Sequence, residues 1–125
     1  MGFKSYRHFR GRISRNNANP RESDIQLQIL RYLNIIGAYG GKCKTVGIMR
    51  KGRYCTDRYL FLGYPDLSFF FRGFFYFCEV KRPGGIQSEA QKRFQQECEL
   101  SGQRYILAYC IENVIEALRK DGHNV

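Results

Sequence analysis

The chain has 125 residues, which is enough for one domain with its own hydrophobic core. It holds 21 Lys and Arg against 11 Asp and Glu, and the net charge of +10 favours a polyanionic partner such as nucleic acid, although a solvated basic surface gives the same count. No apolar run approaches the ~18 residues of a membrane span, and five cysteines without metal-ligand spacing exclude a zinc site and argue against a disulfide framework. We therefore expect a cytoplasmic, intracellular protein with reduced thiols.

The N-terminal segment differs in composition from the rest of the chain. Residues 1–20 are basic, rich in Asn and without acidic side chains, which predicts a flexible arm ahead of a single domain at 21–125. The domain should open with a helix at Glu22, where acidic side chains complement the helix dipole. Gly37 is expected to end this helix.

The next segment combines glycines with a high density of cations. Gly40 and Gly41 lead into a short predicted strand, roughly Cys43 to Ile48, and a basic loop with little periodicity continues to Gly63. This segment and the residue after Lys81 supply the candidate DNA-binding cations Lys42, Lys44, Arg50, Lys51, Arg53 and Arg82.

A β-hairpin rich in aromatic residues carries the most informative pattern. A two-residue turn at Arg72-Gly73 would make Phe71 face Phe74, and the same register brings Asp66 opposite Glu79. Lys81 then lies on the same face as Glu79. Because like charges directly opposite each other destabilise a sheet, a divalent cation between the carboxylates is indicated. An ion pair with Lys81, or a charged edge strand that favours solubility, would need no metal.

The sequence of the C-terminal half predicts a helix, a strand and a second helix. Ser88 and Gln91 fit a capping box at the start of a helix that Gly102 ends. A buried strand at 104–110 and a helix at 111–120 follow. The predicted order α-β-β-β-α-β-α, with helices on both sides of a mixed sheet, belongs to the α/β class.

This order of motifs resembles the PD-(D/E)xK nucleases and, more narrowly, the VRR-NUC (virus-type replication-repair nuclease) family. The resemblance covers about residues 21–118. The matching segments are Glu22-Ser23 with Gln26, Gly63-Tyr64-Pro65-Asp66, Glu79-Val80-Lys81-Arg82-Pro83-Gly84-Gly85, Gln87-Ser88-Glu89-Ala90-Gln91 and Gly102-Gln103-Arg104-Tyr105.

The resemblance implies a restriction-endonuclease-like core and a Mg²⁺- or Mn²⁺-dependent endonuclease that acts on DNA. Stand-alone members of this size are viral, including phage, or bacterial. They resemble Holliday junction resolvases and work as homodimers, so branched or junction DNA is the expected substrate.

The resemblance also implies a role for each matching residue. Asp66 and Glu79 would be metal ligands, together with the backbone carbonyl of Val80, and Lys81 would be the catalytic lysine. The other two implied site residues are Glu22 and Gln91. Glu22 would border the site, although an acid in a first helical turn is often only a dipole partner. Gln91 would reach the site from its helix, although the capping box offers it a different role.

Two other functions remain open from the residues. A non-catalytic module could use the basic arm and the aromatic side chains to bind nucleic acid, but it would leave the paired carboxylates without a purpose. A nuclease that acts on linear DNA or on RNA would use the same site residues.

Overall fold

The structure, a computed structural model, describes residues 19–43, 48–50, 53–55 and 59–125. Most of the predicted arm therefore lies outside the described residues, as do Lys44 and Lys51. The elements in chain order are α1 Glu22–Ile36, β1 Tyr39–Lys42, β2 Ile48–Arg50, β3 Arg53–Cys55, β4 Leu67–Phe71, β5 Phe74–Val80, α2 Glu89–Leu100, β6 Arg104–Ala108 and α3 Ile111–Lys120. In this part of the chain no helix has the length and apolar character needed to cross a bilayer.

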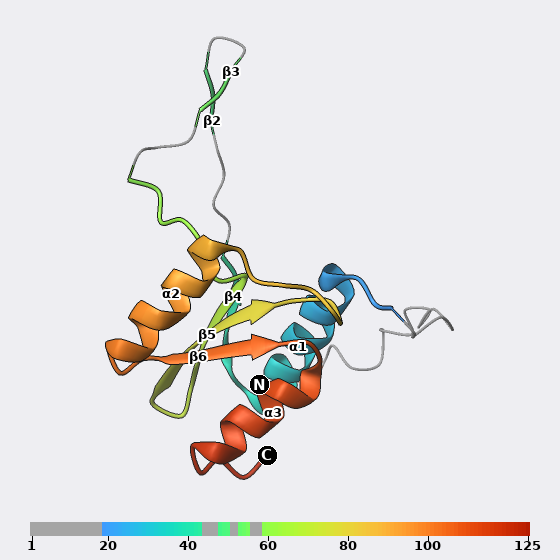
Figure 1. Ribbon diagram of the computed structural model, residues 1–125. Helices are drawn as coiled ribbons and strands as arrows, with labels where there is room; N and C mark the ends of the chain where they lie inside the picture. Colours follow the sequence, from blue (N-terminus) through green and yellow to red (C-terminus); the bar gives the residue numbers. More distant parts are fainter. Residues whose placement is uncertain (1–18, 44–47, 51–52, 56–58) are drawn as a thin grey trace.

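The main sheet has four strands in the order β1-β4-β5-β6. The β1/β4 and β4/β5 pairs are antiparallel, and β5/β6 is parallel, with α2 as the crossover. Apolar side chains of α1 and α3 join alternate residues of β4, β5 and β6 in one core, while Phe94 of α2 packs on Phe77 from the opposite face. Figure 1 shows α2 on one side of the sheet and α1 with α3 on the other. The predicted α/β fold is confirmed.

The aromatic hairpin forms in the predicted register. Phe71 pairs with Phe74 and Leu67 with Cys78. The connecting residues Arg72 and Gly73 both have positive φ angles, 46° and 84°, as a two-residue turn between twisted antiparallel strands requires. Strands β4 and β5 form the centre of the sheet, so the predicted site residues lie at the ends of its two central strands.

The first strand lies earlier than predicted. The sequence indicated roughly Cys43 to Ile48, of which 44–47 lie outside the described residues, whereas β1 covers Tyr39–Lys42 and includes both glycines. Gly40 pairs with Phe69, and a side-chain carbon at Gly40 would overlap Phe69 and the Ser68 carbonyl. A glycine that resembles a strand breaker is therefore needed inside the strand for close approach of the two backbones.

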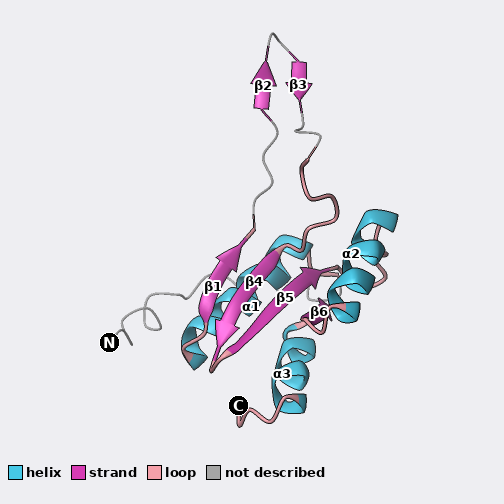
Figure 2. Cartoon of the chain, turned by 90° about the vertical axis from the view of Figure 1, so that its left-hand side faces the viewer, coloured by secondary structure: helices cyan, strands magenta, loops and turns pink. Residues whose placement is uncertain are grey.

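The basic segment is not a plain loop. Strands β2 and β3 pair antiparallel, with Ile48 opposite Cys55 and Arg50 opposite Arg53, and form a separate two-stranded sheet. Figure 2 shows this ribbon drawn apart from the main sheet. The prediction of a loop was wrong here because strands of three residues are too short to produce a readable alternation.

The C-terminal elements agree with the sequence pattern except at one boundary. Ser88 is the N-cap of α2, and α3 occupies the predicted helix 111–120. Strand β6 ends at Ala108 because the next residues turn into α3, whose N-cap is Cys110.

A partly buried polar cluster fixes the C-terminal segment to the face of the sheet that carries α1 and α3. The Tyr76 hydroxyl donates to Asp121 Oδ2 at 2.6 Å, and Arg104 Nε donates to the same oxygen at 2.7 Å. His123 Nε2 lies 3.2 Å from the Tyr76 hydroxyl. Burial opposes the ionisation of Asp121, but the hydrogen bonds from Tyr76 and Arg104 outweigh it and lower the pKa of Asp121.

Removal of the Tyr76 hydroxyl should therefore destabilise the protein. We expect Tyr76→Phe to lower the free energy of unfolding by about 1 kcal/mol, the usual contribution of one hydrogen bond and more if Asp121 is left underpaired. Urea denaturation of the variant and the wild type measures the difference. Equal midpoints and slopes would show that the Tyr76 hydroxyl contributes nothing to stability.

Candidate active site

Asp66 is fixed at the entrance of β4 by main-chain and side-chain hydrogen bonds. Its Oδ2 atom accepts from the backbone N–H of Val80 at 2.9 Å, and its carbonyl accepts from the N–H of Cys43 at 2.8 Å. The last β4/β5 pair is Leu67 with Cys78, and one further step along the strands leads to Asp66 and Glu79. The two carboxylates predicted to face each other thus lie at the same end of the sheet.

Glu79 is a buried carboxylate with only 1% of its surface exposed. Its Oε1 atom accepts a hydrogen bond from Gln91 Nε2 at 2.8 Å and lies 3.8 Å from Lys81 Nζ. Its Oε2 atom is buried and has no hydrogen-bond partner among the described residues. A buried carboxylate oxygen without a partner is strongly unfavourable unless a cation or a proton occupies that position.

The surroundings of Glu79 disfavour its ionised form. Burial is the largest cause, and Asp66 adds to it through its charge and through a hydrogen bond that only the protonated form of Glu79 can share with it, so that the pKa of Glu79 rises from 4.5 to about 8. Lys81 acts in the opposite direction, while Glu22 raises the pKa further. Without a divalent cation these surroundings favour the protonated form of Glu79, and a cation bound there would displace the proton.

Gln91 performs both of the functions that the sequence offered it. The side-chain Oε1 of Gln91 accepts from the backbone N–H of Ser88 at 2.8 Å. The backbone N–H of Gln91 donates to Ser88 Oγ at 3.2 Å, which completes the capping box of α2. The amide nitrogen of the same side chain is the donor to Glu79. The helix cap and the site contact are made at opposite ends of one amide group.

Glu22 opens α1 and is coupled to the site through its charge. It also occupies the first helical turn, where an acid stabilises the helix dipole. The described residues contain no group of three or more His, Cys, Asp or Glu side chains arranged to hold a metal. The acidic centre is therefore the Asp66–Glu79 pair, and Glu22 acts on it through its charge, which raises the pKa of Glu79.

Lys81 and Val80 follow Glu79 at the end of β5. The Lys81 side chain is only 13% exposed, and its N–H donates to the carbonyl of Ala108 at 2.9 Å, which extends the contact with β6 beyond Val80. The N–H of Val80 holds Asp66. The donor set fits Mg²⁺ or Mn²⁺, because carboxylate oxygens are the hard ligands these ions prefer and Glu79 Oε2 has no other partner.

Two of the predicted DNA-binding cations flank this centre. Lys42 ends β1 next to Cys43, whose backbone N–H donates to the carbonyl of Asp66. Arg82 directly follows Lys81, and the side chains of Lys42 and Arg82 are exposed. Arg50 and Arg53 belong to the β2–β3 ribbon.

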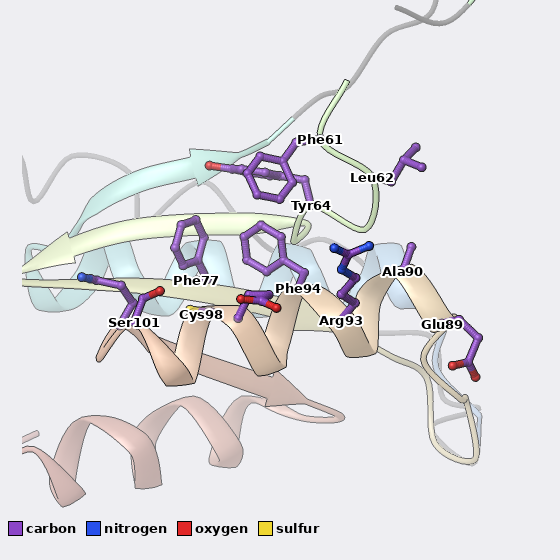
Figure 3. Close-up of a pocket in the computed structure, with 12 residues that line it drawn as sticks. Phe61, Leu62, Tyr64, Phe77, Glu89, Ala90, Arg93, Phe94, Cys98 and Ser101 are labelled. Atoms are coloured by element: carbon purple, nitrogen blue, oxygen red, sulfur yellow. The ribbon is translucent and has the colours of Figure 1, made fainter. Parts of the chain in front are cut away.

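An aromatic groove of about 850 Å³ lies beside α2. Figure 3 shows Phe77 and Phe94 on one side, with Phe61 and Tyr64 across from them. The ring centroids of Tyr64 and Phe94 are 5.3 Å apart. None of the predicted catalytic residues lines this groove, so its aromatic walls are distinct from the carboxylate centre.

The sequence analysis did not single out Tyr105 or Gln87 as site residues. Burial, followed by the charge of Glu79, raises the pKa of Tyr105, and the Tyr105 hydroxyl accepts a hydrogen bond from Gln87. The only signal was their presence in segments of the family resemblance, because the contact joins a loop to a strand far away in sequence.

The comparisons with known proteins agree with this geometry at the level of the fold. The sequence matches no protein-family model, and no curated protein matches it. Among solved structures the chain is similar to a VRR_NUC domain, with 20% identity and a TM-score of 0.58 over 82% of this chain and 97% of the other. The chain has the fold of a VRR_NUC domain, as the resemblance implied.

The raised pKa of Glu79 predicts an unusual dependence of stability on pH. Between 4.5, the ordinary value, and about 8 the folded state holds a proton that the unfolded state releases, so stability should fall as the pH rises through this range. We expect the melting temperature of the metal-free protein to decrease from pH 5 to pH 8, on the order of several degrees.

Thermal unfolding of Glu79→Gln supplies the control. The amide at position 79 does not titrate as the pH changes, and Gln91 can still donate to its side-chain oxygen. The variant should have a flatter profile than the wild type, and Mg²⁺ should raise the wild-type melting temperature most at the high-pH end. Parallel profiles for the two proteins would contradict the assigned pKa.

Proposed function

We propose that this protein is a metal-dependent DNA endonuclease that hydrolyses phosphodiester bonds. The observation that carries the proposal is the buried Glu79 carboxylate, whose Oε2 atom has no partner, beside Asp66 and Lys81 at one end of the sheet. The VRR_NUC-like fold supports a nuclease-type domain. Mg²⁺ or Mn²⁺ is the proposed cofactor, with Asp66, Glu79 and the Val80 carbonyl as its ligands.

Different residues of the site would have different roles in hydrolysis. A bound divalent ion would act as a Lewis acid on the scissile phosphate and lower the pKa of the attacking water. Lys81 would orient that water or stabilise the charge that develops on the phosphate. Gln91 keeps Glu79 Oε1 occupied, which leaves Oε2 free for a cation. Glu22 adds negative charge at the border of the site.

The charge distribution supports nucleic acid as the partner. The chain carries a net charge of +10, and the exposed Lys42 and Arg82 flank the acidic centre. A non-catalytic binding module would gain nothing from a pair of carboxylates, which repel phosphate unless a cation lies between them. A metal-dependent nuclease accounts for both the exposed cations and the buried acids.

Branched or junction DNA is the proposed substrate, and a homodimer the proposed assembly. A closed two-fold dimer would present two equivalent centres to two symmetry-related strands, which one domain with one centre cannot do. Paired nicks on opposite strands of a four-way junction are the expected product pattern.

Cleavage assays with Lys81→Ala test the proposed function. Labelled linear duplex, single strand and four-way junction are incubated with Mg²⁺ or Mn²⁺ and, in parallel, with EDTA. We expect the wild type to cleave only with metal and Lys81→Ala to lose about 10²- to 10³-fold in kcat, as when one stabilising donor is removed.

The matched control is Lys120→Ala, which removes an exposed lysine from the end of α3 and should keep wild-type activity. Tight binding without any cleavage by the wild type would refute the enzyme. Equal rates on linear duplex and junction would refute only the preference for branched DNA, and exclusive cleavage of RNA would redirect the proposal to RNA.

Binding measured as a function of salt tests the roles of Lys42 and Arg82. Each alanine variant should weaken duplex binding and reduce the slope of log K against log salt by about 1, because one phosphate contact is lost. Fluorescence anisotropy in EDTA measures binding without cleavage. Lys120→Ala should keep the wild-type slope, and unchanged slopes in Lys42→Ala and Arg82→Ala would place the DNA elsewhere.

A further inference from the structure

A polar network beside Glu79 connects the elements that supply the site. Gln87 Nε2 donates to Gln95 Oε1 at 3.0 Å and to the Tyr105 hydroxyl at 3.2 Å. Gln87 belongs to the loop between β5 and α2, Gln95 to α2 and Tyr105 to β6. One amide group thus joins a loop, a helix and a strand.

Gln95 and Tyr105 lie on the same element faces as two of the site residues. Gln95 lies one helical turn beyond Gln91 on the same side of α2. Tyr105 pairs with Phe77 and so lies on the sheet face that also carries Glu79. The charge of Glu79 is the second cause, after burial, of the raised pKa of Tyr105, which places the phenol within the field of the carboxylate.

The two contacts of the Gln91 amide restrict where the first turn of α2 can lie. The amide must reach the Ser88 N–H and Glu79 Oε1 together, at 2.8 Å each. The first turn of α2 therefore has to lie at a fixed height above β5. Gln87 directly precedes Ser88, and its two hydrogen bonds hold the end of the loop down on β6 and α2.

We propose that Gln87 and Tyr105 are positioning residues that hold Gln91 against Glu79 and thereby keep Glu79 Oε2 aimed at the cation. The inference rests on the proposed function and names residues of that same site. Groups that orient metal ligands typically change metal affinity about 10- to 100-fold when they are removed.

Two substitutions remove the network without a change of overall shape. Tyr105→Phe deletes only the hydroxyl, and Gln87→Leu replaces the amide by an apolar group of similar size. The matched control is Tyr76→Phe, which deletes a buried tyrosine hydroxyl that bonds Asp121 on the opposite face of the same sheet. A purely structural role would make the control and the two variants behave alike.

The first readout is Mn²⁺ binding to the protein without DNA, measured by isothermal titration calorimetry. The second is kcat and KM for junction cleavage at saturating Mn²⁺. We expect Tyr105→Phe and Gln87→Leu to weaken Mn²⁺ binding about tenfold and to lower kcat with little change in KM. Tyr76→Phe should lower the melting temperature and leave the Mn²⁺ dissociation constant unchanged.

Wild-type Mn²⁺ affinity in both network variants would overturn the inference, and so would an equal loss of affinity in Tyr76→Phe. A wild type that binds Mn²⁺ but cleaves no nucleic acid would refute the proposed function. The Mn²⁺ affinities of the three variants would still decide the role of the network in that case.

Discussion

The structure depends on one constraint, which is the burial of the Glu79 carboxylate between the sheet and α2. Burial of a charge is unfavourable unless partners replace the lost water. Here Gln91 and Lys81 satisfy one oxygen and leave the other without a partner in the described part of the chain. The position of α2, the register of the hairpin and the end of β5 all serve to place this carboxylate beside Asp66.

Much of the frame around the site could be predicted because local sequence signals agree there. The positive φ angles demanded by a two-residue turn suit Arg72-Gly73, and this turn sets the register of a hairpin whose side chains are largely apolar. The register in turn leads to Asp66 and Glu79 at one end of the sheet. The capping box at Ser88 fixed the start of α2 and hence the turn that carries Gln91.

The features that escaped prediction depend on contacts between distant segments. Gly40 resembles a strand breaker until its close approach to Phe69 is known. The β2–β3 ribbon is too short for a periodic pattern. The hydrogen bond between Gln87 and Tyr105 joins residues 18 positions apart, and neither residue type by itself predicts a polar contact beneath a helix. Such contacts follow from packing, which a local pattern does not encode.

The double use of the Gln91 amide limits which residues evolution can place there. Glutamate could accept the Ser88 N–H but would set a second negative charge against Glu79, and asparagine is one methylene too short to reach both groups. Leucine or lysine would offer no acceptor to the helix cap. Position 91 is therefore expected to tolerate almost no substitution, and α2 cannot shift along the sheet independently of the site.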